Sequence, residues 1–157
     1  MHREGLAHLD VKPANILQAR TVPLCYKLAD FGLAARLDGA FPVEDGDRQY
    51  LPAELLAGEH GSLPAADIFC LGISLYELAS GAALPHEGEQ YTQLRQGQLQ
   101  LPATCPEALG TAIKARNICA ASMFHSGWHI DDTFGSAVDM PVCAHTSLCA
   151  VCNVCMC

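Results

Sequence analysis

The stretch that decides the fold is HLDVKPANIL, residues 8–17, near the beginning of the chain. Asp10, Lys12 and Asn15 follow the pattern D-x-K-P-x-N, which lets one tight loop present a carboxylate, an ammonium and an amide oxygen to a common point. A second acidic turn, Asp30–Gly32, follows a short apolar run. Transfer of a phosphoryl group requires a group that orients the incoming hydroxyl, a cation on the transferred phosphate and oxygen ligands for Mg²⁺. The four polar side chains supply these groups in that order.

Composition restricts the class of protein. The chain has 157 residues, of which 50% are hydrophobic and 17% charged, so we expect about one domain that collapses rather than a disordered chain. Nine Lys and Arg against seventeen Asp and Glu give a net charge of −8, so we expect no basic surface and no nucleic-acid partner. We also expect no membrane span and no secretory signal, which predicts an intracellular protein of the nucleus or cytoplasm.

Hydrophobic patterning predicts an α+β fold that is mainly helical. Residues 65–81 form the clearest helix, with Gly81 as its C-terminal cap, and its apolar residues occupy nearly every face. Such a helix is typical of the centre of a domain. Residues 87–99 predict a weaker surface helix, residues 26–29 a short strand, and residues 32–50 a long irregular loop.

Four motifs in this order resemble the large lobe of eukaryotic protein kinases. The loop at residues 8–17 resembles the catalytic loop, and Asp30–Gly32 resembles the metal-binding triplet. YLPAELL, residues 50–56, stands where kinases have an Ala-Pro-Glu motif, and residues 66–81 resemble their central helix. The resemblance implies that Mg²⁺ and ATP are the cofactors.

The resemblance also implies a role for each matching residue of the catalytic site. Asp10 corresponds to the catalytic base, and Lys12 to the group that neutralises the transferred phosphate. Asn15 and Asp30 correspond to the Mg²⁺ ligands that hold the nucleotide's phosphates.

Three further residues have structural roles in the family. His8 resembles the buried histidine of the catalytic loop, and Asp67 the helix aspartate that accepts hydrogen bonds from the catalytic-loop backbone. The alternative for Asp67 is a helix acid stabilised by the helix dipole. Glu54 corresponds to a glutamate that pairs with a later arginine, and Arg116 is a candidate partner whose surroundings do not match the family.

Within the kinases, the chain resembles the Wee and Myt group of cell-cycle kinases. His-Leu-Asp at residues 8–10, the acidic run at 43–56 and the stretch 66–102 carry this resemblance. It implies a protein substrate, a cyclin-dependent kinase phosphorylated on an inhibitory tyrosine and in some members also on threonine, which delays mitosis. Residues 32–53 contain no Ser or Thr, so packing and unmodified charges are expected to hold this segment.

The kinase-like region is expected to be an incomplete large, C-terminal lobe. We assign residues 1–106 to a partial kinase domain, from the catalytic loop to the region of the family's helix G. The family's glycine-rich loop and the Lys and Glu that serve ATP are not among these residues. We therefore expect the isolated chain to bind ATP weakly and to be inactive. The alternative function is a noncatalytic fragment that acts through protein–protein interaction.

Residues 107–157 are expected to be an irregular, cysteine-rich tail. Five of the nine cysteines lie in the last fifteen residues, at positions 143, 149, 152, 155 and 157. An odd, uneven set without a secretion signal does not predict a disulfide framework. Their spacing and His145 leave a metal-binding module as a third hypothesis, although the spacing matches neither a common zinc site nor an iron–sulfur site.

Overall fold

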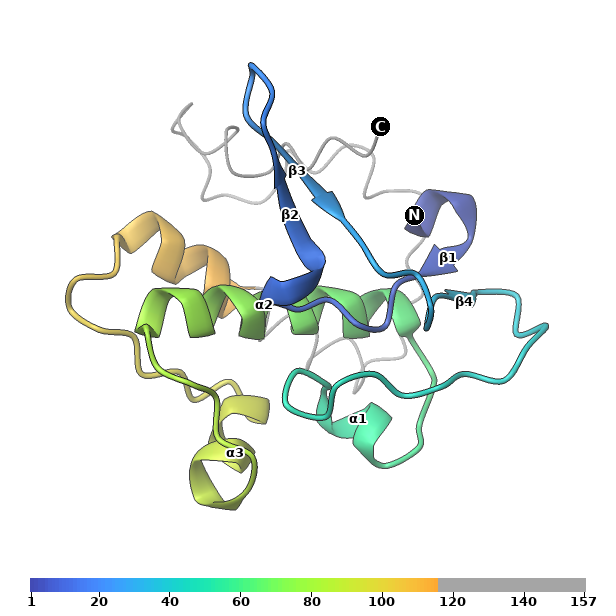
Figure 1. Cartoon of the computed structure of the whole chain (residues 1–157). Helices are drawn as coiled ribbons and strands as arrows, with labels where there is room; N and C mark the ends of the chain where they lie inside the picture. Colours follow the sequence, from blue (N-terminus) through green and yellow to red (C-terminus); the bar gives the residue numbers. More distant parts are fainter. Residues whose placement is uncertain (116–157) are drawn as a thin grey trace, which may run out of the picture.

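A computed structural model of the chain describes residues 1–115 and shows a mixed α and β architecture in which helices predominate (Figure 1). The strands are β1 (Leu6–Ala7), β2 (Ile16–Ala19), β3 (Cys25–Leu28) and β4 (Ala35–Arg36), and the helices are α1 (Ala53–Leu56), α2 (Leu63–Ser80) and α3 (Gly88–Arg95). Short 3-10 helices η1 (His2–Glu4) and η2 (Pro13–Asn15) flank the first strand and precede the second.

Two small antiparallel sheets place the predicted motifs. In the first, β2 pairs with β3, with Ile16 opposite Leu28 and Ala19 opposite Cys25. In the second, β1 pairs with β4, which ties the chain before the catalytic loop to the chain after Asp30. The β2–β3 hairpin lies on one side of α2 in Figure 1, and α1 and α3 lie on the other.

Helix α2 is the centre of the described fold. It begins two residues before the predicted start, because Pro64 suits the first turn of a helix, and it ends at the predicted cap, Gly81, whose φ is 65°. Phe69 and Ile73 are buried on it, but Leu78 is 64% exposed. The sequence predicts apolar residues on nearly every face of this helix, but in the structure only some of these residues are buried.

One correction concerns membrane-spanning segments. Among the described residues, α2 has the length and mean hydropathy, 1.3, that a membrane-crossing helix requires, contrary to the expectation that no segment does. Alanines such as Ala79 raise its hydropathy, although polar residues such as Asp67 and Glu77 interrupt the run of large apolar side chains. Half of the 18-residue window is buried inside the fold, as in the core helix of a soluble protein.

Two groups of buried side chains pack on α2. The first joins the catalytic-loop residues Leu9 and Val11 to Leu55 and Ala66. The second joins Phe69 and Ile73 to α3 and the chain before it. Burying a large aliphatic or aromatic side chain contributes roughly 1.5–3 kcal/mol, so both groups hold the catalytic loop and α3 against the same helix.

The expected irregular tail differs from the structure at its start. Residues 107–115 are helical, Ile113 is fully buried, and a Cβ on Gly110 would lie 3.2 Å from the Leu101 side chain. Pro106 and the Leu109–Ile113 spacing are compatible with a helix that buries one apolar edge. The remainder of the predicted tail, including Arg116, His145 and the cysteine cluster, lies outside the described residues.

Candidate active site

Asp10, Lys12 and Asn15 converge within one loop. Asn15 Nδ2 donates hydrogen bonds to the backbone oxygen of Asp10 at 2.9 Å and to its Oδ2 at 2.8 Å. Lys12 Nζ lies 3.1 Å from the same Oδ2. Asp10 is only 9% exposed, so its carboxylate is held by these donors rather than by bulk water. The loop therefore brings together the three groups that the spacing predicts.

The Lys12 ammonium is stabilised in its charged form. Partial burial lowers the pKa of Lys12, but hydrogen bonding and attraction to Asp10, with a further contribution from Asp47, outweigh burial and raise the pKa above its ordinary value. Lys12 is thus a fixed positive charge at neutral pH, which suits it to contact a phosphate.

Asn15 and Asp30 lie at the same end of the β2–β3 hairpin. Asn15 immediately precedes β2, and its backbone oxygen accepts a hydrogen bond from Ala29 N at 2.9 Å. Asp30 directly follows Ala29 in the chain. The amide oxygen Asn15 Oδ1 accepts no hydrogen bond that we observe within residues 1–115, while Asp30 is exposed. Both residues can therefore offer oxygen atoms at this edge.

The donor set fits Mg²⁺, which prefers one or two carboxylates with substrate phosphates and water over an all-protein cage. Among residues 1–115, no three His, Cys, Asp or Glu side chains form a group that could hold a metal by themselves. Asn15 and Asp30 would hold Mg²⁺ only together with ligands from a nucleotide or water.

His8 connects the catalytic loop to the chain before Asp30. The ring is completely buried, with Nε2 3.0 Å from the carbonyl oxygen of Ala29, and Nδ1 accepts a hydrogen bond from Asp10 N at 3.3 Å. A carbonyl can only accept and a backbone N–H can only donate, so the pattern fits the tautomer with its proton on Nε2. The Phe31 ring packs 5.3 Å from that of His8.

Asp67 of α2 anchors the backbone of the catalytic loop. Its two carboxylate oxygens accept hydrogen bonds from His8 N and Leu9 N, both at 2.8 Å, and its Oδ2 lies 2.7 Å from His2 Nε2. Leu9 has a left-handed φ of 64°, a conformation that costs roughly 1–2 kcal/mol for a residue with a side chain. Asp67 lies beyond the first turn of α2, where the helix dipole acts, so its contacts favour anchoring over the dipole alternative.

Glu54 lies in α1 and is half-buried. Its backbone oxygen accepts hydrogen bonds from Ala57 N at 3.1 Å and Glu59 N at 2.8 Å, which close the end of this short helix. The candidate partner Arg116 is outside the described residues, so this pairing stays a prediction.

Asp47 is a site residue that sequence reasoning missed. Its Oδ2 lies 3.4 Å from Lys12 Nζ, and its backbone N–H donates to Asp10 Oδ1 at 3.3 Å. Asp47 Oδ1 accepts a hydrogen bond from Gln49 N at 3.1 Å, which fixes the turn. A signal was present in the Gly-Asp pair at positions 46 and 47, because a glycine beside a carboxylate permits close approach of the backbone.

Gly46 allows the Asp47 turn to lie directly against the catalytic loop. A Cβ at Gly46 would collide with the carbonyl oxygen of Leu9 and would lie 3.3 Å from Asp10 Oδ1. Gly46→Ala is therefore expected to lower the free energy of unfolding by about 1–3 kcal/mol, the usual cost of overpacking, as measured by urea denaturation followed by circular dichroism.

Gly39→Ala is the matched control. Gly39 has φ 71° but no atom within 4 Å of its would-be Cβ, so only backbone strain of about 1 kcal/mol is expected. A loss for Gly46→Ala no greater than that for Gly39→Ala would show that the close approach to Leu9 is unimportant.

Comparison with known proteins agrees with this geometry. The sequence profile of the protein kinase domain matches residues 1–121. This chain belongs to the protein kinase family. The resemblance predicted from the catalytic-loop motifs is confirmed, and protein kinases in general are phosphotransferases that use ATP and a divalent metal.

The relatives place this kinase near the Wee group. It is 44% identical to a Wee1-like protein kinase of Oryza sativa subsp. japonica over 115 residues, which cover 73% of this chain and 22% of the relative. It is 46% identical over 101 residues to a Wee1-like protein kinase of Arabidopsis thaliana, and the match covers 64% of this chain and 20% of the relative. A membrane-associated tyrosine- and threonine-specific cdc2-inhibitory kinase of Drosophila melanogaster is 42% identical over 101 residues, and the match covers 63% of this chain and 18% of the relative.

The kinase thus spans about a fifth of the length of these curated relatives. Their similarity shows that the matched region of this chain resembles the kinase domain of the Wee group.

Proposed function

We propose that this chain supplies the catalytic loop and the Mg²⁺-binding residues, within the large lobe, of a Wee-like kinase that transfers the γ-phosphoryl group of ATP to a tyrosine. The observation that carries the proposal is the convergence of Lys12, Asn15 and Asp47 on the buried Asp10 carboxylate. The substrate would be a cyclin-dependent kinase, and its phosphorylation would restrain entry into mitosis. The fly relative, whose name states cdc2 inhibition, supports this choice.

The residues of this chain would divide the work as follows. The Asp10 carboxylate, oriented by Asn15 and by the Asp47 backbone, would orient the substrate hydroxyl and accept its proton. Lys12, kept charged by its acidic neighbours, would offset charge on the transferred phosphoryl group. Asn15 and Asp30 would hold Mg²⁺, which supplies charge neutralisation to the phosphates when it is bound.

Choice of a tyrosine hydroxyl does not follow from the catalytic loop alone, because DVKPAN at residues 10–15 also suits serine/threonine kinases. The proposal rests here on the Wee-like relatives, one of which is named as specific for both tyrosine and threonine. Threonine is therefore the second acceptor to test.

We also propose that the 157-residue polypeptide by itself transfers little or no phosphate, since the ATP-binding Lys and glycine-rich loop of kinases are not among its residues. We also propose that the protein is located in the nucleus or cytoplasm, because its proposed substrate, a cyclin-dependent kinase, would be found there.

The test is a chimera in which residues 1–115 replace the matching segment of the rice Wee1-like kinase. We expect the chimera to phosphorylate a peptide from the glycine-rich loop of a cyclin-dependent kinase and to lose activity when Phe replaces the peptide's tyrosine. A peptide that retains only the neighbouring threonine measures the second specificity. A folded chimera that phosphorylates none of these peptides would contradict the proposal.

A further inference from the structure

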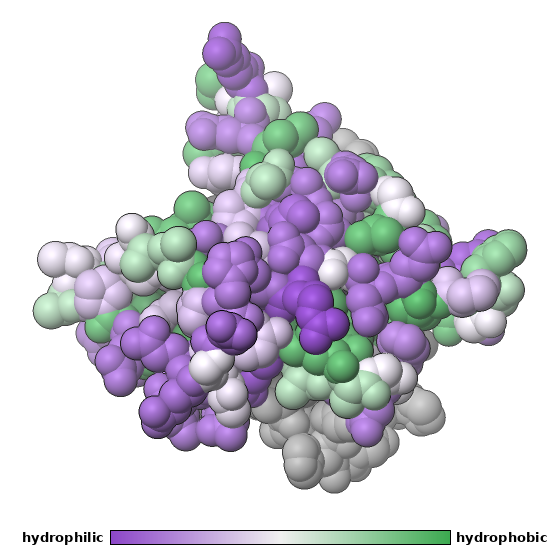
Figure 2. All heavy atoms as spheres, turned by 60° about the horizontal axis from the view of Figure 1, so that its bottom comes forward, coloured by the Kyte–Doolittle hydropathy of each residue, from purple (hydrophilic) through white to green (hydrophobic). Residues whose placement is uncertain are grey.

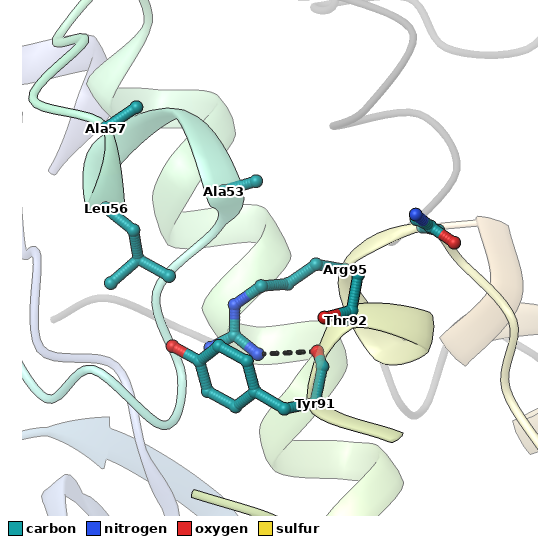
Figure 3. A pocket seen from close by; sticks show the side chains of 7 residues that line it. Ala53, Leu56, Ala57, Tyr91, Thr92 and Arg95 are labelled. Atoms are coloured by element: carbon teal, nitrogen blue, oxygen red, sulfur yellow. Dashed lines mark hydrogen bonds between the residues drawn. The ribbon is translucent and has the colours of Figure 1, made fainter. Parts of the chain in front are cut away.

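Helix α3 is attached to the rest of the fold by polar as well as apolar contacts. Its sequence, GEQYTQLR, is mostly polar, and its buried residues are Leu94 and Arg95. A pocket of about 400 Å³ lies between α1 and α3 (Figure 3), so side chains of α1 do not fill this space. Figure 2 brings this lower part of the molecule forward and shows hydrophilic and hydrophobic residues mixed over it. The position of α3 therefore depends in part on the hydrogen bonds that it makes.

Arg95 makes such hydrogen bonds with the backbone of residues 47–50, the Asp47 turn. Its Nη2 donates to the backbone oxygens of Arg48 at 2.7 Å and Gln49 at 3.2 Å. The Tyr91 hydroxyl donates to the same Arg48 oxygen at 3.0 Å. Three hydrogen bonds thus run from α3 to two consecutive carbonyl groups inside the turn.

The Arg95 guanidinium is itself held in one orientation. Its Nη1 donates to Tyr91 O at 3.0 Å, and its central carbon lies 3.4 Å from the centre of the Tyr91 ring (Figure 3). The residue is only 9% exposed, and hydrogen bonds from a charged donor are stronger than those between neutral groups. A planar guanidinium fixed in this way presents Nη2 in a set direction, so it can hold the two carbonyl groups in place.

The turn that Arg95 holds is the one that contacts the catalytic loop. Asp47 Oδ2 lies 3.4 Å from Lys12 Nζ, and Asp47 N donates to Asp10 Oδ1 at 3.3 Å. A hydrogen bond of 2.9 Å from Tyr50 N to Asp47 O closes the turn. Because Asp47 is joined to Arg48 by a peptide bond, a shift of the Arg48 carbonyl would move Asp47 relative to Lys12.

The other contacts of the turn with distant segments act through its own side chains. Tyr50 Oη donates to Glu77 Oε2 at 2.7 Å, and Gln49 Nε2 donates to Leu84 O at 3.1 Å. Side chains can rotate without moving the backbone that carries them, whereas Arg95 binds the backbone directly. Residues 32–53 also contain no Ser or Thr on which a phosphate could fasten this segment.

We propose that Arg95 is a positioning residue for phosphoryl transfer. From α3 it holds the backbone of the Asp47 turn, so that the Asp47 carboxylate stays against Lys12 and the Asp47 N–H against Asp10. The inference rests on the proposed function, because it assigns one more residue to the same site. Loss of Arg95 would affect kcat more than the KM for ATP, since no hydrogen bond observed within residues 1–115 joins the turn to Asn15 or Asp30.

The first test is a double-mutant cycle in the rice-kinase chimera. We expect Arg95→Gln to lower kcat about tenfold with the KM for ATP within threefold, and Asp47→Asn to lower kcat by a similar factor. The double variant should lie within threefold of Asp47→Asn, because Arg95 acts through Asp47. A purely structural role would lower the melting temperature without this dependence. Independent effects that multiply to about a hundredfold, or full kcat in either single variant, would overturn the proposal.

A milder pair of variants decides the question if Arg95→Gln does not fold. Tyr91→Phe keeps the ring beside the guanidinium and removes one hydrogen bond to Arg48 O, so we expect kcat to fall about threefold. Tyr76→Phe is the matched control, because the Tyr76 hydroxyl donates to a backbone oxygen elsewhere, Gln100 O at 3.4 Å. Its kcat should be unchanged. Equal kcat in the two variants would overturn the proposal.

The second test needs no catalysis and uses the full 157-residue chain, labelled with ¹⁵N and kept reduced. We expect Arg95→Gln to speed hydrogen exchange at the Tyr50 amide at least tenfold, because this amide closes the turn. Exchange at Leu9, whose acceptor is Asp67, should stay within threefold. Equal acceleration at both amides, or none at Tyr50, would overturn the proposal. An inactive unsubstituted chimera would instead contradict the proposed function, and exchange alone would then decide whether Arg95 holds the turn.

Discussion

Replacing Asp10 by Asn in the rice-kinase chimera is expected to lower kcat by a factor of roughly 10²–10⁴, the usual contribution of a positioned general base. The substitution keeps the shape of the side chain and an oxygen that can accept hydrogen bonds from Asn15 and Lys12. What it removes is the ability to take the proton of the substrate hydroxyl. The amide nitrogen takes the place of Oδ1 and loses the hydrogen bond from Asp47 N. We therefore expect a somewhat lower melting temperature, little change in the KM for ATP and a fall in kcat far larger than the loss of stability explains.

Asp38→Asn is the matched control for this measurement. Asp38 is exposed, forms an ion pair with Arg36 at 2.6 Å and accepts a hydrogen bond from Ala40 N at 3.0 Å. Its hydrogen bonds and ion pairs within residues 1–115 include no member of the Asp10 cluster. Its variant should keep the activity of the chimera. If Asp10→Asn retained activity within about threefold of the unsubstituted chimera, Asp10 would not be the base, and the role that the family resemblance implies would not apply here.

The catalytic loop was predictable because its chemistry is local. Asp10, Lys12 and Asn15 lie within six consecutive residues, so a tight loop is enough to bring them together. Asp30 was predictable for a related reason, since a short hairpin returns the chain to Asn15. Nearness in sequence translated directly into nearness in space.

Asp47 was not predictable on those terms. It reaches Lys12 from 35 residues away, through a loop with no hydrophobic period, and its position depends on Gly46 lying against the carbonyl of Leu9. A contact of this kind is decided by how two irregular segments pack. Composition marks such a segment as a loop but does not show which backbone it will touch.

The environment of Arg95 illustrates a second limit. The pattern of residues 87–99 predicts a surface helix, because charged and polar residues dominate it. In the structure Leu94 and Arg95 are both buried, and carbonyl oxygens from residues 48 and 49 accept the guanidinium N–H groups. An arginine can be buried when backbone acceptors surround it, and those acceptors come from a distant loop that helix periodicity does not describe.

Replacing Asp67 by Asn is expected to lower the free energy of unfolding by about 3–5 kcal/mol, the typical cost of breaking a buried, hydrogen-bonded charge. Asp67 is 5% exposed and accepts hydrogen bonds from two backbone N–H groups and from His2. An Asn has one acceptor oxygen, so its amide nitrogen would face a backbone donor and leave that donor unpaired at a further cost. Since a domain of this size is stable by only about 5–15 kcal/mol, the loss would be a large part of the total.

The measurement is urea denaturation followed by far-ultraviolet circular dichroism, with hydrogen exchange at His8 and Leu9 as a local readout. Loss of the carboxylate should speed exchange at these two amides, because Asp67 is their acceptor and Leu9 then loses the bond that offsets its left-handed backbone. Glu89→Gln is the control, since Glu89 is exposed on α3 and contacts only Gln93 among the hydrogen bonds of the described residues. Unchanged exchange at both amides in a folded Asp67→Asn variant would mean that α2 does not anchor the catalytic loop through this carboxylate.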